Sequence, residues 1–142
     1  MRRYYEFAVV IILLSILAVF LMQALGRARS DMEEAGVQAE VAAIRTELLE
    51  VLVHRETFGG SLPKTDNPID WVSSRPRNYL GVLDKAPDAK AVWYFNGQAN
   101  ELIYRFEDGH LARFRLTREA GATTARGVLA GVGLLRLDDK SE

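Results

Sequence analysis

An unbroken apolar run opens the chain. Phe7 to Leu25 contains no charged side chain, and a helix of that length reaches about 28 Å, close to the hydrocarbon thickness of a bilayer. The run is longer than the roughly 7–15-residue apolar core of a secretory signal, and the following residues, Gly26-Arg27-Ala28-Arg29, lack an A-x-A-like cleavage site. The pattern predicts an uncleaved transmembrane helix over residues 7–25.

Apolar residues then recur at steps of three and four. Ser30 and Glu33 have the spacing of a capping box, so either a new helix starts there or one helix continues through. The recurring apolar residues form one stripe along a helix, and charged residues such as Glu47 fall outside it. Gly59 can take the left-handed conformation that ends a helix. We predict an amphipathic helix over residues 26–58, which packs through Val37, Val41, Ile44, Leu48, Val51 and Leu52.

Residues 59–88 contain all four prolines of the chain. This composition predicts a loop region with short ordered patches at best. Its larger apolar side chains are expected to attach the loop to the core: Ile69, Trp71, Tyr79, Leu80, Val82 and Leu83.

Residues 89–142 are predicted to form an antiparallel sheet domain, because β-rich runs are broken at Asn96-Gly97 and Asp108-Gly109. A two-residue turn at Asp108-Gly109 aligns Leu102, Tyr104 and Phe106 with Arg113 and Arg115. A three-residue loop, residues 107–109, aligns them with Ala112, Phe114 and Leu116 instead. We predict the three-residue loop. A fourth strand is expected within residues 127–137, although three glycines weaken it.

Together these elements predict an α+β fold, in which a long N-terminal helix, half membrane-spanning and half amphipathic, packs on a small antiparallel sheet. With 142 residues, the chain has room for one modest domain beside the span. Arg2 and Arg3 precede the span and favour a cytoplasmic position for residues 1–6, although Arg27 and Arg29 on the other side reduce the bias.

Composition argues against several function classes. The net charge of -1 provides no general basic field for nucleic acid, and the absence of cysteine excludes thiolate nucleophiles and Cys-based zinc sites. The only histidines are His54, near the predicted helix end, and His110, beside a turn, so a His-based triad or metal centre has little to work with. No nucleophile elbow or phosphate-binding loop is present. We expect a protein that is not an enzyme and has no cofactor.

Two polar clusters are weaker candidates for binding. Asp66 and Asp70 could contribute oxygens to calcium, but aspartates in such loops are more often turn formers. Arg105, Arg113 and Arg115 would share the sheet face opposite the core, where they could meet DNA or an acidic partner subunit. A solvated sheet face predicts the same pattern, so nucleic acid is not favoured.

Four stretches carry a resemblance to a known family. Tyr4 to Ile12 (YYEFAVVII) is an apolar helix start with one glutamate; NPIDWV begins at Asn67, NYLG at Asn78 and WYFNGQANELIYRF at Trp93. With the order of elements, these resemble the type IV pilin-like family, which includes the pseudopilins of type II secretion. The resemblance implies a pilin-like fold and a non-enzymatic subunit of a type IV pilus or a type II secretion pseudopilus.

The resemblance also implies roles and partners. Glu6 would pair with the terminal amine of a neighbouring subunit, with Arg2 and Arg3 beside it at the assembly site. The implied partners are other pilin or pseudopilin subunits, an inner-membrane assembly platform, the lipid bilayer and the prepilin peptidase. The protein would be a single-pass protein of the bacterial inner membrane with a periplasmic C-terminal domain. A simpler role for Glu6 also fits, because an anion is favoured in the first helical turn and the arginines are one turn away.

The start of the chain departs from the family pattern. The peptidase cleaves after a glycine, yet Met1 stands at that position and Arg2 replaces a usual hydrophobic residue. Either the true start lies upstream, or the chain is not processed in the usual way. The alternative function is an unprocessed single-span envelope scaffold that uses the stripe from Val37 to Leu52 for a coiled-coil-like partner. A pilin would cover this stripe with its own strands, through residues such as Tyr104 and Phe114.

Overall fold

The structure is a computed structural model that describes residues 1–118, 128–129 and 132–137. It divides into two compact units, Met1–Gly36 and Val37–Glu142. The parts of the predicted sheet region at 119–127, 130–131 and 138–142 lie outside the described residues.

The first unit is helical. Helix α1 (Arg2–Phe58) begins here and has no break at Ser30, so the capping-box spacing does not start a new helix. An 18-residue window of this helix has a mean hydropathy of 2.8, and that window is 0% buried. By its length and composition the helix could cross a membrane. The helix ends as expected. Gly59 has a φ of 76° and donates its N–H to the Arg55 carbonyl at 2.8 Å.

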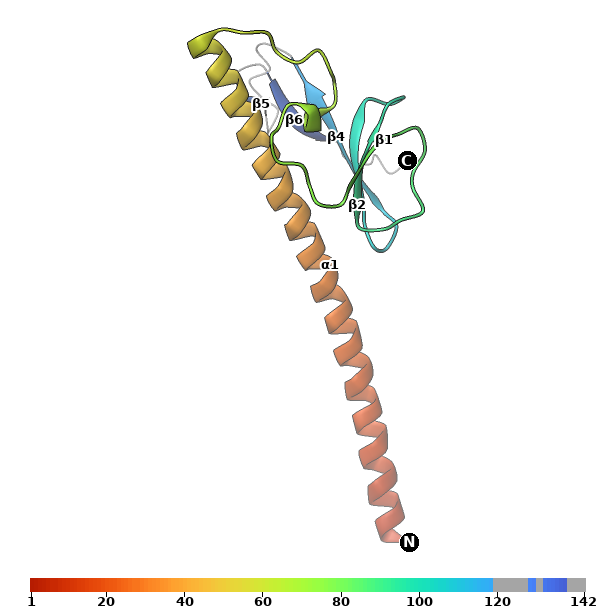
Figure 1. Cartoon of the computed structure of the whole chain (residues 1–142). Coiled ribbons are helices and arrows are strands. Elements are labelled where there is room, and N and C mark those ends of the chain that lie inside the picture. Colours follow the sequence, from red (N-terminus) through yellow and green to blue (C-terminus); the bar gives the residue numbers. More distant parts are fainter. Residues whose placement is uncertain (119–127, 130–131, 138–142) are drawn as a thin grey trace. The chain divides into compact units, whose positions relative to one another are not determined.

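The second unit holds residues 37–58 of α1 and a six-stranded sheet (Figure 1). The spatial order is β1-β2-β3-β4-β6-β5. Strand β1 runs parallel to β2, and the other neighbours are antiparallel. The predicted α+β fold is confirmed, with a mixed sheet in place of a purely antiparallel one. The strands are β1 (Tyr79–Leu83), β2 (Val92–Asn96), β3 (Glu101–Arg105), β4 (Leu111–Thr117), β5 (Val128–Leu129) and β6 (Val132–Leu137).

The predicted loop region over residues 59–88 contains two short ordered patches, the 3₁₀ helix Pro68–Asp70 and strand β1, and the sequence did not identify β1 as a strand. Strand β1 is short, contains Gly81 at a φ of 102°, and shifts register between Tyr79 and Val82. The exposed positions of the strand are the apolar Leu80 and Val82, so its sequence lacks the apolar–polar alternation by which a strand is recognised. Ile69 and Trp71 are buried as expected, but the expected core residues Leu80 and Val82 are 48% and 61% exposed.

The turn between β3 and β4 has the predicted three-residue loop. Leu102 pairs with Phe114 and Tyr104 with Ala112, so all four lie on the same face and are buried. The loop closes through the N–H of Phe106, which donates to the His110 carbonyl at 2.9 Å. The break at Asn96-Gly97 is a four-residue loop, because Asn96 pairs with Glu101 across it. The predicted fourth strand is β6, which pairs with β4.

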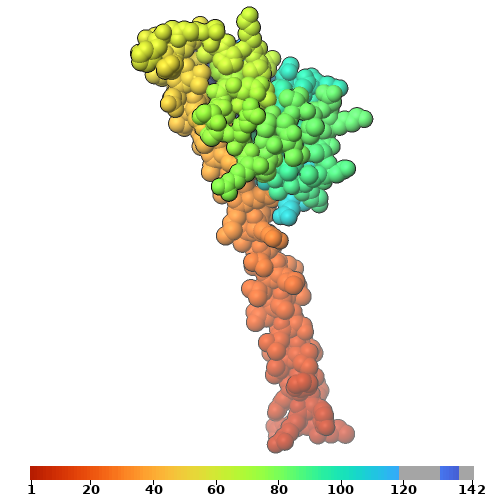
Figure 2. Space-filling model, viewed as in Figure 1, coloured from red at the N-terminus to blue at the C-terminus, as the bar shows by residue number. Residues whose placement is uncertain are grey.

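One core joins α1 to the sheet. The stripe lies against the sheet face that carries Trp93, Tyr104 and Phe114. In Figure 2 the yellow-green segment that follows α1 lies at the surface of this unit. From the helix, the core contains Val37, Val41, Ile44, Leu48 and Leu52, with Val51 partly buried against it.

Candidate functional site

The predicted assembly residues lie at the start of α1. Glu6, Arg2 and Arg3 are all exposed. Arg2 and Arg3 lie within one helical turn of Glu6, where helical side chains can meet. Nevertheless, in the part of the chain that the structure describes, Glu6 forms no ion pair. Its own chain therefore leaves the carboxylate exposed.

Polar side chains beside the stripe attach α1 to the sheet. The Trp93 indole Nε1–H donates to the Glu40 carboxylate, and Trp93 is fully buried. The Arg45 guanidinium donates from Nε and Nη2 to the Leu134 carbonyl in β6, at 3.1 and 2.9 Å. These bonds satisfy buried polar groups at the edges of the apolar contact, and they fix the position of α1 along the sheet.

Glu47 holds the segment after the short 3₁₀ helix (Pro68–Asp70) against α1. Its Oε2 accepts from the Ser73 N–H at 2.8 Å, the Ser73 hydroxyl at 3.1 Å and the Ser74 N–H at 3.3 Å, and its Oε1 accepts from the Ser74 hydroxyl. The hydrogen bond from the Ser74 side chain is the main cause that lowers the pKa of Glu47, and the bonds from Ser73 and from the Ser74 backbone add to it. Glu47 is therefore ionised at neutral pH.

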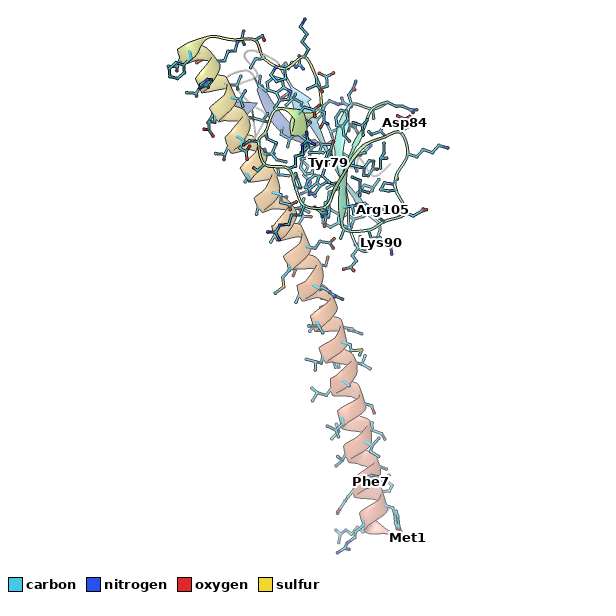
Figure 3. The ribbon with its side chains drawn as sticks, viewed as in Figure 1. Met1, Phe7, Tyr79, Asp84, Lys90 and Arg105 are labelled. Carbon is cyan, nitrogen blue, oxygen red and sulfur yellow. The ribbon has the colours of Figure 1, made fainter. Side chains whose placement is uncertain are left out.

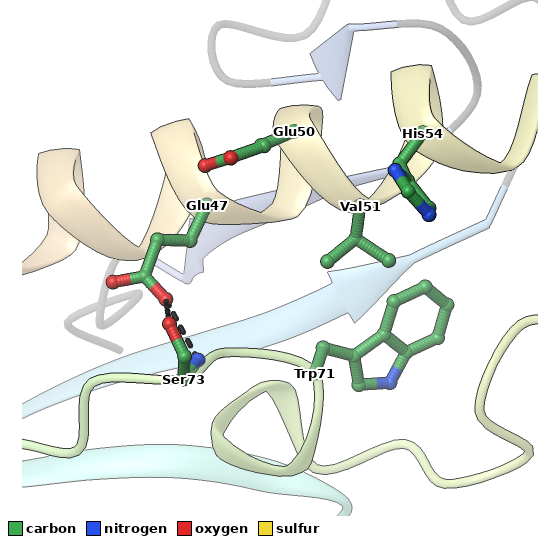
Figure 4. A pocket seen from close by; sticks show the side chains of 6 residues that line it. All are labelled: Glu47, Glu50, Val51, His54, Trp71 and Ser73. Atoms are coloured by element: carbon green, nitrogen blue, oxygen red, sulfur yellow. Dashed lines mark hydrogen bonds between the residues drawn. The ribbon is translucent and has the colours of Figure 1, made fainter. Parts of the chain in front are cut away.

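A groove lies between α1 and this segment (Figure 4). We call it the α1 groove. It encloses about 320 Å³. Val51 and the Trp71 indole form an apolar surface, and Glu50 and His54 line the groove from α1. The lining residues are Glu47, Glu50, Val51, His54, Trp71 and Ser73.

The weak calcium candidates have protein partners. The Asp70 carboxylate accepts from the Thr65 hydroxyl at 3.0 Å, and Asp66 forms an ion pair with Arg118 at 3.1 Å. The neighbouring Asn67 caps the 3₁₀ helix, since its Oδ1 accepts from the Ile69 N–H at 3.1 Å. Among the described residues no group of three or more His, Cys, Asp or Glu side chains has a geometry that could hold a metal.

The three predicted arginines do share a face. Strand alternation places Arg105, Arg113 and Arg115 opposite the face that packs on α1, because their neighbours Tyr104, Ala112 and Phe114 belong to the core. We call this surface the arginine face. Its members make contacts within the chain: Arg115 Nη2 lies 2.8 Å from the buried Glu101 carboxylate, and Arg105 donates to the Pro87 carbonyl in the β1–β2 connection (Figure 3 labels Arg105).

The two histidines lie in different places. His54 packs against Phe58 with ring centroids 4.9 Å apart, near the end of α1. His110 stacks on Phe106 at 3.8 Å and contacts the Asp108 carboxylate beside the β3–β4 loop. Hydrogen bonds from the His110 backbone and ring lower the pKa of Asp108. The geometry of each histidine is that of a local structural contact.

Sequence reasoning placed Glu47 outside the apolar stripe and assigned it no role. Its position is as predicted, but its bonds to Ser73 and Ser74 come from a segment 26 and 27 residues away. The sequence feature that could have indicated this role is the position of Glu47 next to Leu48 at the border of the stripe, where a charged side chain can reach a neighbouring segment. The α1 groove was not predicted, because it depends on where that segment lies.

Comparison of the chain with known protein families, characterised proteins and solved structures finds no significant match.

Proposed function

We propose that this protein is a non-enzymatic, pilin-like subunit of a type IV pilus or a type II secretion pseudopilus, which assembles through its N-terminal helix. The observation that carries the proposal is a contrast along α1. The stripe from Val37 to Leu52 is buried by the chain's own sheet, whereas the apolar residues 7–25 are exposed in the part of the chain that the structure describes. Lipid before assembly, and helices of other subunits after it, would cover residues 7–25.

Glu6 supplies the assembly chemistry in this proposal. A charged side chain in a membrane helix costs roughly 2.5–3.5 kcal/mol at the centre on insertion scales, and it gains from a partner of opposite charge. Glu6 has no ion pair with Arg2 or Arg3 in the described chain. The terminal amine of a neighbouring subunit is the proposed partner, and the two arginines would remain at the cytoplasmic interface.

The proposed setting is the bacterial inner membrane, with residues 1–6 in the cytoplasm and the sheet domain in the periplasm. The partners would be the lipid bilayer, other pilin-like subunits and an inner-membrane assembly platform. A prepilin peptidase is also a partner in this proposal.

Burial of the stripe bears on the alternative function. An envelope scaffold that binds a coiled-coil partner needs an accessible apolar stripe on its helix. Val41 and Leu48 are 0% and 1% exposed, and both belong to the core that contains Tyr104 and Phe114. This burial favours the pilin-like subunit over a scaffold of that kind.

The proposal is tested by the incorporation of a Glu6→Gln variant into filaments in the native host. We expect the variant to reach the membrane but to be lost from filaments, because the uncharged glutamine side chain cannot form the ion pair. Glu56→Gln is the matched control, since Glu56 is also an exposed glutamate of α1. The intact mass of the extracted protein, with and without the peptidase, would show whether processing occurs. A Glu6→Gln variant that assembles normally would contradict the proposal.

A further inference from the structure

We propose that the α1 groove of one copy receives an arginine side chain from the arginine face of a second copy. The inference rests on the proposed function, because it names the contact that assembled copies of the sheet domain make with one another. Both surfaces belong to the second unit and are formed by described residues.

The α1 groove has the size and chemistry for a long cationic side chain. Its volume of about 320 Å³ is many times the roughly 10–15 Å³ that one water molecule needs on the same measure. Glu47 is ionised at neutral pH, as its lowered pKa requires, and Glu50 is an exposed carboxylate one turn further along α1. Val51 and Trp71 provide apolar surface for the methylene groups of an arginine.

Trp71 already interacts with a guanidinium. The Arg118 Cζ lies 5.4 Å from the centroid of the Trp71 ring, within the range of a cation–π interaction. The ring therefore attracts cations in this setting. Trp71 is 4% exposed, so a second guanidinium in the α1 groove would reach only the exposed edge of the indole and would interact mainly with the carboxylates of the groove.

The arginine face has the complementary charge. It carries Arg105, Arg113 and Arg115, and the buried Glu101 carboxylate pairs with Arg115. The Arg105 bond is to a neutral carbonyl, so it leaves the positive charge of the guanidinium in place. Among the described residues named here, the face carries three arginines and one glutamate, whereas the α1 groove is lined by two glutamates.

The two surfaces lie on opposite sides of the sheet. The core residues Tyr104 and Phe114 face α1, and the arginines alternate with them along β3 and β4. A contact between two different surfaces is heterologous, and it can repeat from copy to copy without closing into a dimer. This geometry suits a filament.

Cross-linking between copies of the full-length chain tests the contact. The sequence contains no cysteine, so engineered cysteines are the only thiols of the protein. Two differently tagged forms, Glu50→Cys and Arg113→Cys, are produced together in the native membrane and treated with a short bis-maleimide. We expect a mixed-tag dimer. If Arg113→Cys reduces the amount of folded protein, Arg115→Cys provides a second position on the arginine face.

Three controls define the result. Glu56→Cys with Arg113→Cys is the matched pair outside the α1 groove and should yield several-fold less dimer. Each cysteine form expressed alone should also yield little, because a heterologous contact does not bring identical positions together. A mixed dimer no stronger than the Glu56 control, or strong self-linking of Glu50→Cys, would overturn the proposal.

Charge reversal gives an independent test on the same surfaces. Glu50→Arg should lower self-association about tenfold, as expected for loss of one interfacial charge pair. Arg113→Glu should weaken it similarly, and the double variant should recover association. If the double variant self-associates as weakly as each single variant, the α1 groove does not pair with the arginine face.

A reporter in the membrane helix separates this inference from the proposed function. Leu17→Cys detects contact between the apolar helices of neighbouring copies. Cross-linking at Leu17 without cross-linking between the α1 groove and the arginine face would contradict the groove contact but not the pilin-like function. Loss of cross-linking at both places would contradict both.

Discussion

Glu40, Arg45 and Glu47 determine how α1 is attached to the sheet domain. Each lies next to the apolar stripe and binds a polar group that the packing has brought to its edge. A hydrogen bond to a charged group contributes about 1.5–3 kcal/mol, against about 0.5–1.5 kcal/mol for a neutral one, and the exposed bonds of Glu47 contribute less than the buried ones. These hydrogen bonds fix the position of α1 along the sheet more strictly than apolar packing alone would.

Replacement of Glu47 by glutamine should destabilise the domain in a pH-dependent way. At pH 7 we expect a loss of about 1 kcal/mol in the free energy of unfolding, since glutamine accepts weaker hydrogen bonds than an ionised carboxylate. The folded-state pKa of Glu47 lies below its ordinary value of 4.5, so its contribution is complete above that pH and disappears as the pH falls through the lowered pKa. The difference between wild type and variant should therefore shrink in acid.

Denaturant titrations followed by tryptophan fluorescence measure this effect, because both tryptophans of the chain, Trp71 and Trp93, are buried in the domain. Glu56→Gln serves as the control at an exposed position of the same helix. A difference that stays constant from pH 7 down to acid would rule out the ionised carboxylate as the source of the stability.

At the scale of elements, the stripe on α1 is the largest contribution of a single segment to the core. Its residues repeat with the helical period, so their common face could be recognised from the sequence alone. The β3–β4 register was equally predictable, because only the three-residue loop places Tyr104 and Phe114 together on the buried face. Strand β1 could not be recognised, since its exposed positions are the apolar Leu80 and Val82, Gly81 between them has no side chain, and its partner β2 is parallel.

Leu48→Ala should destabilise the sheet domain strongly. Leu48 is 1% exposed, and truncation of a fully buried leucine typically costs about 2–5 kcal/mol through lost burial and the cavity left behind. Val53→Ala is the matched control on the same helix, because Val53 is 53% exposed. The two variants are compared by denaturant midpoint. Equal losses for both would mean that the stripe does not pack on the sheet as described.

At the scale of the whole molecule, two parts of α1 differ in exposure: the apolar residues 7–25 and the stripe from Val37 to Leu52. Among the described residues, the apolar side chains of residues 7–25 are exposed, whereas the stripe from Val37 to Leu52 is covered by the sheet. The apolar surface of the first unit is thus available to lipid or to other helices, and that of the second unit is largely satisfied within the fold. This division matches the proposed subunit, which must reside in a membrane and then assemble.

Two arginines in the span should prevent stable membrane integration. Leu13→Arg with Leu17→Arg adds about 5–7 kcal/mol to the insertion free energy, comparable with the whole favourable contribution of such a span. Met32→Arg is the control, since Met32 lies outside residues 7–25. Alkaline carbonate extraction separates integrated from released protein. Retention of the double variant in the membrane fraction would show that residues 7–25 are not what holds the chain there.

The sequence by itself determined the apolar span, the stripe, the end of α1 at Gly59 and the β3–β4 register, because each depends on neighbours in the chain and on a fixed period. Tertiary structure alone decided the parallel pairing of β1, the bonds of Glu47 to Ser73 and Ser74, and the α1 groove. These features join segments that are distant in sequence, and nothing in the local pattern of either segment specifies which partner the other will meet.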